Sequence, residues 1–245
     1  MSRWLMVEKA APAPRREDSL SRDRIVDVAI ELLDAEGESG LTFRALAGRL
    51  ATGPGAIYWH VANKGELLTA ACDAIVSRTM TIAVAGESPE TDIRALALGL
   101  FDAIDAHPWV GSALTRAPGQ LPAVRILEGL GQALCALGVP AERQWPTVSA
   151  LLSYILGVAG QNAANAHVGR TLGTDRLAFL SSVAATWSEL DEEAFPFVRS
   201  MAGPLREHDD RADFLAGIDL ILGGVRGRRG VIREEVSPCA HAPDR

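Results

Sequence analysis

Cysteine and aromatic residues are scarce in this sequence. The 245 residues include three cysteines, and phenylalanine, tryptophan and tyrosine together make up 5%. Cys72, Cys135 and Cys239 are odd in number and widely spaced, so neither a disulfide framework nor a zinc-binding pattern fits them. This usage is typical of a reducing compartment, and we expect a cytoplasmic protein.

Long apolar runs and strand-like patterns are also missing. One stretch, Gln144–Gly169, has no Asp, Glu, Lys or Arg and is long enough to span a bilayer. Its second half is polar and includes Gln161, Asn162 and Asn165. We therefore expect a buried core or interface helix there and no membrane partner. No convincing alternating pattern and no Asn-Gly or Asp-Gly pair indicates a hairpin.

The sequence contains no recognisable catalytic or metal-binding motif. The five histidines show no metal-ligand spacing, and neither H-E-x-x-H nor G-x-S-x-G occurs. Gly129-Leu130-Gly131 lacks the third glycine and the preceding strand of a nucleotide-binding loop. We therefore expect a protein that is not an enzyme and that holds no metal or cofactor.

Apolar residues recur with the helical period along most of the chain. Ile25, Val28, Ala29, Leu32 and Leu33 follow the spacing i, i+3, i+4, i+7, i+8. Prolines divide the chain into pieces of helical length, because a proline inside a helix removes a hydrogen bond and causes a clash. With 48% hydrophobic residues and a net charge of −7, the composition is that of a globular protein. The pattern predicts an all-α fold of about nine or ten helices.

The segment Ser21–Ile75 is the most informative part of the chain. Thr42 is a suitable N-cap for a short helix over Phe43–Leu50, which the turn Ala51–Gly53 joins to a very short helix over Pro54–Trp59. Longer helices precede and follow this pair. Two short helices joined by a tight turn are typical of a helix-turn-helix, which places its second helix in the major groove of DNA.

A stretch without carboxylates coincides with this motif. From Ser39 to Gly65 the sequence has Arg44, Arg49 and Lys64 and no Asp or Glu. The other 21 of the 24 basic residues stand against all 31 acidic residues. A locally positive patch on an acidic protein favours DNA binding with little non-specific attachment. Arg49 is expected to be a solvated or internal charge rather than a residue that reads bases.

The run LTFRALAGRL followed by ATGPGAIYWHVANKGELL resembles the TetR family of bacterial transcription regulators, and YWHV followed by NK is especially similar to its tetracycline-repressor branch. The resemblance implies DNA contact by this part of the chain. Arg44 is the best candidate for reading bases, because Gly53 and Gly55 have no side chains. The candidate DNA-binding residues are Thr42, Arg44, Thr52, Gly53, Pro54, Gly55, Tyr58, Trp59, His60 and Lys64.

Two aromatic residues of this set have alternative interpretations. Tyr58 is expected to contact phosphate, although it would also suit a packed core position. Trp59 fits equally well as a DNA contact or as an indole packed under the loop.

The rest of the chain resembles, more loosely, the ligand-binding and dimerisation domain of the tetracycline-repressor type. The resemblance covers His107-Pro108-Trp109 and the segments 152–165 and 195–225. It implies a homodimer in which helices over 145–166 and 211–225 pair with their copies as a four-helix bundle. Small residues recur on the first of these helices, which would allow close approach of two copies, although burial within one subunit would explain them too.

Candidates for an effector pocket combine apolar walls with a few amides, a combination that also fits a plain core. They are Ile104, His107, Trp109, Leu127, Leu130, Trp145, Tyr154, Gln161, Asn162 and Asn165. His107 aligns with a histidine that helps to hold a ligand-bound magnesium in the tetracycline repressor. The fourth helix has Met80 and no second histidine that could complete such a magnesium site. We therefore expect His107 to cap a helix C-terminus.

These features predict a ligand-responsive DNA-binding transcriptional regulator. We expect a homodimeric repressor that a small, mostly apolar effector releases from a palindromic, double-stranded operator. A transcriptional activator of the same fold and a helical small-molecule-binding protein without a role on DNA are the alternatives. The expected organisation is a flexible tail over 1–20, a helix-turn-helix domain over 21–68, a ligand-binding and dimerisation domain over 69–228 and a C-terminal tail over 229–245.

Overall fold

The computed structural model describes residues 20–83, 88–173 and 175–234, and all regular elements in these ranges are α-helices. The predicted all-α fold is therefore confirmed. The helices are α1 (Arg22–Gly40), α2 (Phe43–Arg49), α3 (Pro54–Tyr58), α4 (Lys64–Ala83), α5 (Pro89–Ala106), α6 (Trp109–Arg116), α7 (Leu121–Ala136), α8 (Ala141–Leu172), α9 (Arg176–Ser188), α10 (Pro196–Ser200), α11 (Ala202–Arg206) and α12 (Asp210–Glu234).

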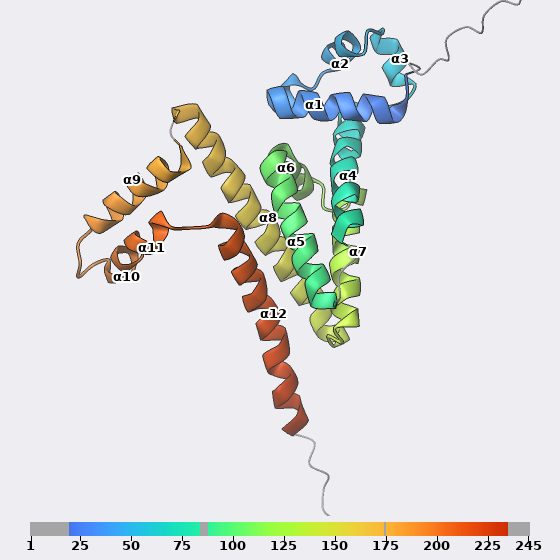
Figure 1. Cartoon of the computed structure of the whole chain (residues 1–245). Coiled ribbons are helices and arrows are strands. Elements are labelled where there is room, and N and C mark those ends of the chain that lie inside the picture. The colour runs from blue at the N-terminus through green and yellow to red at the C-terminus, as the bar shows by residue number, and fades with distance from the viewer. Residues whose placement is uncertain (1–19, 84–87, 174, 235–245) are drawn as a thin grey trace, which may run out of the picture.

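Helices α1, α2 and α3 form a small head at one end of the molecule (Figure 1). Its centre consists of Ile25, Leu46 and Ile57, one from each helix, and all three are fully buried. The expected N-caps are in place: Ser21 Oγ accepts a hydrogen bond from the Arg24 amide at 3.2 Å, and Thr42 Oγ1 accepts one from the Ala45 amide at 3.1 Å. Local capping and one shared apolar centre together define the head.

The left-handed residue of the turn between α2 and α3 is an alanine. Ala51 has φ of 49°, whereas Gly53 has φ of −84° and is the N-cap of α3. The left-handed region is unfavourable for a residue with a Cβ. The turn therefore holds a strained alanine, and the conformational freedom of Gly53 is not used.

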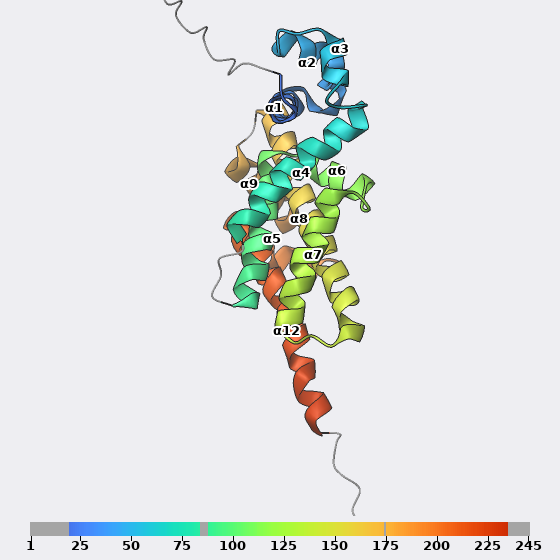
Figure 2. The same ribbon diagram turned by 90° about the vertical axis from the view of Figure 1, so that its right-hand side faces the viewer.

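Helix α4 connects the head to the body of the molecule. It starts beneath α1 and runs down between α5 and α7 (Figures 1 and 2). Its first turn is capped from both sides: Asn63 Oδ1 accepts from the Glu66 amide at 2.9 Å, and Glu66 Oε2 accepts from the Ala62 amide at 2.8 Å. The Ala62 amide and the nearby Arg22 guanidinium lower the pKa of Glu66.

The body is built around α5, α7 and α8, with α12 packed against α5 and α8. Leu151, Ile155 and Ala159 lie on the inner side of α8 and are buried. The uncharged stretch Gln144–Gly169 lies within this helix, so it is a core helix on one side as expected. No helix in the described parts of the chain is both long and apolar enough to cross a membrane.

Helices α9, α10 and α11 form an arm that projects from the body (Figure 1). The arm packs mainly on itself, through α9 and α11. Helix α12 then returns along the body and extends to Glu234, beyond the expected start of the C-terminal tail at residue 229. The expected N-terminal tail lies outside the described residues except for Leu20.

Candidate DNA-binding head and effector cavity

The outer surface of the head presents three of the predicted DNA-contact side chains. Trp59 is 90% exposed and Tyr58 is 55% exposed. Arg44 is exposed and takes part in no ion pair among the described residues. The alternative in which Trp59 packs under the loop is wrong, because the indole is exposed to solvent.

Tyr58 combines the two roles considered for it. Its ring stacks on Phe43 of α2, with centroids 4.3 Å apart and an interplanar angle of 5°. This contact fixes the direction of the side chain while more than half of its surface stays exposed. The phenol is therefore held by packing across the α2–α3 junction and remains accessible to a partner.

The remaining candidates lie around the same surface. Pro54 and Gly55 are exposed in the first turn of α3 and His60 is half-buried. The amide of Thr52 donates to the Ala47 carbonyl at 3.0 Å, so Thr52 helps to close the turn. Thr42 uses its hydroxyl as the N-cap of α2. Thr42 and Thr52 thus shape this surface by fixing the start of α2 and the turn that follows it.

Two basic residues of the head make polar contacts with residues of α1. The ammonium of Lys64 donates to the carbonyl of Glu38 near the end of α1. Arg49 lies 3.7 Å from a carboxylate oxygen of Glu31 and 3.7 Å from one of Glu36. Arg49 is thus a solvent-exposed arginine paired with two carboxylates, in keeping with its interpretation as a solvated or internal charge. Arg44 is also exposed and takes part in no ion pair among the described residues.

A group of polar contacts joins the head to α6 of the body. Asp34 of α1 accepts from Trp109 Nε1 at 2.8 Å, and its same oxygen lies 2.8 Å from His107 Nδ1. Further along α1, Glu38 binds the guanidinium of Arg116 and accepts from the Ser112 hydroxyl at 3.2 Å. Both ends of α6 are thus tied to α1, so movement of α6 or of the preceding turn will act on the head.

A cavity of about 700 Å³ lies between α8, the arm and the start of α12. Its size is in the range of small-molecule sites. One side is apolar, and the other carries amides and charged groups. The apolar lining includes Phe179, Leu180, Val183, Trp187 and Leu205, and the polar lining includes Gln161, Asn162, Asn165, Arg176, His208 and Asp210. We call this space the α8–α9 cavity.

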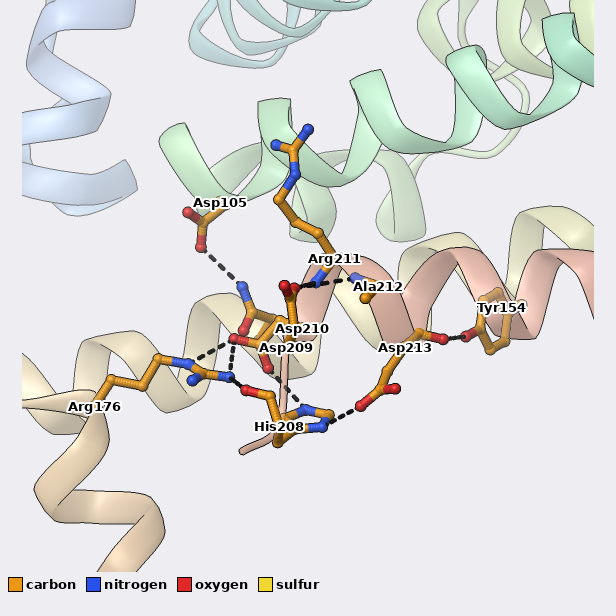
Figure 3. A network of polar contacts seen from close by, with 10 residues as sticks. Asp105, Tyr154, Arg176, His208, Asp209, Asp210, Arg211, Ala212 and Asp213 are labelled. Atoms are coloured by element: carbon orange, nitrogen blue, oxygen red, sulfur yellow. Dashed lines mark hydrogen bonds and ion pairs between the residues drawn. The ribbon is translucent and has the colours of Figure 1, made fainter. Parts of the chain in front are cut away.

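The polar side of the α8–α9 cavity is an ordered network (Figure 3). Arg176 Nε donates to Asp210 at 2.7 Å, and Arg176 also donates to the His208 carbonyl at 2.9 Å. The imidazole of His208 lies between carboxylates, with Nε2 2.9 Å from Asp210 and Nδ1 against Asp213. These contacts hold the start of α12 against α9 and fix the positions of the groups that a ligand would meet.

A smaller hollow of about 250 Å³ adjoins this network between α5, α8 and α12. Tyr154 lies in its wall, donates to the Phe214 carbonyl at 3.1 Å and stacks on the Phe214 ring. Burial, followed by the nearby carboxylate of Asp213, raises the pKa of Tyr154. Gln161, Asn162 and Asn165 line both spaces.

Six of the predicted pocket residues lie elsewhere. Ile104 and Leu130 are fully buried core residues, and Leu127 packs against the same core. Trp145 is 68% exposed, so it forms no pocket wall. His107 and Trp109 face the head, and His107 is the C-cap residue of α5, as expected of a structural histidine. For Ile104, Leu127 and Leu130 the reason is that apolar periodicity identifies buried positions but does not separate a cavity wall from a packed core.

The apolar wall on α9 was missed in the sequence interpretation. Phe179, Val183 and Trp187 follow one another at steps of four residues and therefore share one face of a helix. That spacing was the available signal. Within the described residues no group of three or more His, Cys, Asp and Glu side chains is arranged to hold a metal ion.

Comparison with known proteins agrees with the geometry of the head. The family model for bacterial regulatory proteins of the tetR family matches residues 25–71. An HTH-type transcriptional regulator of Saccharopolyspora erythraea is 32% identical over 155 residues, which are 63% of this chain and 64% of that relative.

A solved structure extends the similarity over most of the chain. The transcriptional regulator SCO7222, a TetR from Streptomyces coelicolor, has 52% sequence identity and a TM-score of 0.78, and the match covers 84% of this chain and 98% of that one. Fold and head thus define a helix-turn-helix transcriptional regulator. This chain belongs to the TetR family.

A more distant member of the family has been solved with a small molecule. ActR from Streptomyces coelicolor in complex with actinorhodin has 25% sequence identity and a TM-score of 0.69, with 86% of this chain and 99% of that one covered. Its likeness extends over the body as well as the head.

Proposed function

We propose that this protein is a homodimeric transcriptional repressor that binds operator DNA through its head and releases it when a small molecule occupies the α8–α9 cavity. The observation that carries the proposal is the outer surface of the head, where Arg44, Tyr58 and Trp59 are all exposed. All three belong to the sequence motifs that resemble the family. Tyr58 and Trp59 are consecutive and both exposed, which places two large aromatic side chains on the surface where a helix-turn-helix meets DNA.

In this proposal the residues divide between positioning and reading. Phosphate and sugar contacts come from Tyr58, Trp59, His60 and the backbone around Gly53–Gly55, and Arg44 reads base edges. Because Lys64 contacts the Glu38 carbonyl, its contribution to DNA affinity passes through the orientation of the head as well as through charge. Because we propose that the protein binds operator DNA, we place it in the cytoplasm. The proposed regulation involves no chemical reaction, so we assign the protein no enzyme activity.

The dimer is proposed to form through the outer faces of α8 and α12. Gly157 and Gly160 of α8 have no other atom within 4 Å of the position that a Cβ would take. On α12, Leu220 is 79% exposed and Gly224 likewise faces open space. A bulky residue at Gly160 should yield a monomer with little operator affinity, and light scattering measures this directly.

The effector is proposed to be a small, mostly apolar molecule with a few polar groups. This follows from the α8–α9 cavity, where five large apolar side chains face three amides. Family likeness to ActR, which is solved with a bound small molecule, supports the same assignment. Helix α4, which enters the body from the head, remains the expected lever between the two parts.

The central experiment is selection of bound duplexes from a random DNA pool, followed by titration of the selected operator. We expect a near-palindromic site with half-site centres about 34–36 Å apart. Arg44→Ala should relax the sequence preference, whereas Lys64→Arg keeps the charge and serves as the matched control. Wild-type protein that prefers no selected duplex over bulk DNA would refute the proposed function.

The cavity assignment has its own test. Nile red, a neutral planar dye with one ring carbonyl, should bind with increased fluorescence. Val183→Trp fills the cavity from α9 and should abolish this signal. Ser181→Trp adds the same side chain at an exposed position of the same helix and should preserve it. Equal effects of the two substitutions would show that the dye binds elsewhere.

A further inference from the structure

One hydrogen bond of the polar wall of the α8–α9 cavity is made to a residue of helix α5. Asn162 Nδ2 donates to Asp105 Oδ1 at 3.0 Å, across the gap between α8 and α5. Figure 3 shows this bond beside the network of the arm and α12. Asn162 lies in the walls of the α8–α9 cavity, of the hollow of about 250 Å³ and of a further hollow of about 500 Å³ between the end of α5, α8 and the start of α12. A ligand in any of these spaces meets the same amide.

Asp105 belongs to the last turn of α5, immediately before the turn that contacts the head. His107 is the C-cap of this helix, and its amide donates to the Ala103 carbonyl at 2.9 Å. Its imidazole lies 2.8 Å from Asp34 of α1, which also accepts from Trp109 at 2.8 Å. Only Ala106 therefore separates a residue that contacts the cavity wall from one that contacts the head.

The stiffness of the intervening segment matters for transmission. Ile104, in the same turn of α5, is fully buried, and Trp109 at the start of α6 is 6% exposed. Packed segments of this kind shift as units rather than deform locally. A displacement of the α5 C-terminus at Asp105 thus reaches Asp34 without being absorbed by a loose loop.

We propose that Asn162 is the residue through which the cavity controls the head: an effector acceptor group takes the Asn162 amide from Asp105, and the freed end of α5 shifts His107 and Trp109 against Asp34. This inference rests on the proposed function and adds the route of regulation and a requirement on the ligand. The group that competes is a neutral acceptor such as a ring carbonyl, because a ligand carboxylate would face Asp105 and Asp210. The reciprocal nature of coupling makes the route testable from either end.

The first test measures operator affinity with a donor–acceptor exchange. Asn162→Asp places two carboxylates against each other and should weaken operator binding by about fivefold or more, the lower end of typical coupling. Adding Asp105→Asn restores a bond with the roles exchanged and should return the affinity to within about twofold of wild type. Ser181→Asp, with the same charge change at an exposed position of α9 outside the cavity lining, should stay within about twofold.

The second test asks whether the effect passes through Asp34. In an Asp34→Ala background, Asn162→Asp should change operator affinity by less than about twofold, as expected when the coupling is broken. A full effect in that background, or an equal effect of Ser181→Asp, overturns the route. Thermal unfolding of each variant verifies that it is folded. If one of the single variants is unfolded, the double variant with Asn162→Asp and Asp105→Asn still tests the route.

A third measurement is independent of DNA, so that failure of the route and failure of the proposed function are distinguishable. Amide hydrogen exchange of residues 29–36 in α1 should be faster in Asn162→Asp and unchanged in Ser181→Asp. Nile red at saturation should produce the same increase in wild type. Unchanged exchange in Asn162→Asp refutes the route even where operator binding is intact, and absence of Nile red binding, or binding without faster exchange, refutes the ligand requirement.

Discussion

Gly217 of α12 provides a direct test of how the start of this helix is held. A Cβ at this position would lie 1.9 Å from Tyr154 Oη and 2.3 Å from its Cζ. The Tyr154 ring is not free to move aside, because it stacks on Phe214 at 5.5 Å and its hydroxyl donates to the Phe214 carbonyl at 3.1 Å. Gly217→Ala must therefore displace Tyr154 or push α12 away from α8.

The magnitude follows from these contacts. Overpacking by one methyl group in a fixed site costs about 1–3 kcal/mol, and loss of the Tyr154 hydrogen bond adds about 1 kcal/mol. The better helix propensity of alanine returns about 1 kcal/mol. A net loss of about 1–3 kcal/mol corresponds to a decrease in Tm of about 2–12 °C for a chain of this size.

Thermal unfolding followed by circular dichroism is a suitable assay, with two comparisons. Gly131→Ala in α7, where a Cβ meets no atom within 4 Å, should raise Tm through helix propensity alone. In a Tyr154→Ala background, Gly217→Ala should also become neutral or stabilising, since the obstacle has been removed. A higher Tm for Gly217→Ala in the wild-type background would refute this account of the α8–α12 contact.

Three further outcomes are expected. Trp59→Ala should leave Tm unchanged, because the indole is 90% exposed, and should lower operator affinity in a fluorescence titration; retained affinity would exclude the indole from the interface. Ala51→Gly should stabilise the head by up to about 1 kcal/mol in chemical unfolding, because it relieves a left-handed alanine; a destabilised variant would contradict the strain. Burial and, to a lesser degree, Asp73 raise the pKa of Cys72 from 9.0 to about 12. Since the folded state then holds this proton more tightly than the unfolded chain, wild type should lose more stability than Cys72→Ala as pH rises from about 9 to 12; equal losses would count against a buried thiol.

Sequence reasoning was most successful where the determining interactions are local. Thr42 caps α2 within three residues, and the apolar positions of the short helices converge on one centre at Leu46. A motif of this length fixes its own geometry, so the head and its exposed residues could be predicted. The left-handed backbone of Ala51 was not predicted, because no local sequence signal marks an alanine for that conformation.

The cavity could not be predicted in the same way, because its walls come from distant segments. Asn162 of α8 faces Val183 of α9 and His208 before α12, and no periodicity within one helix reports that meeting. The interpretation found the amides on α8 through their common face but paired them with His107 and Trp109, which lie against Asp34 instead.

That separation changes the expected mechanism of regulation. An effector beside His107 would press directly on the junction between head and body, whereas a ligand in the α8–α9 cavity acts at a distance and needs a connection. Helix α5 offers one, because its last turn binds Asn162 through Asp105 and its C-cap residue contacts Asp34. In this route Asp34 of α1 is the common hydrogen-bond acceptor of the His107 imidazole and the Trp109 indole. A displacement of either ring would therefore act on α1. Regulation would then depend on the position of the α5 C-terminus as much as on the swing of α4.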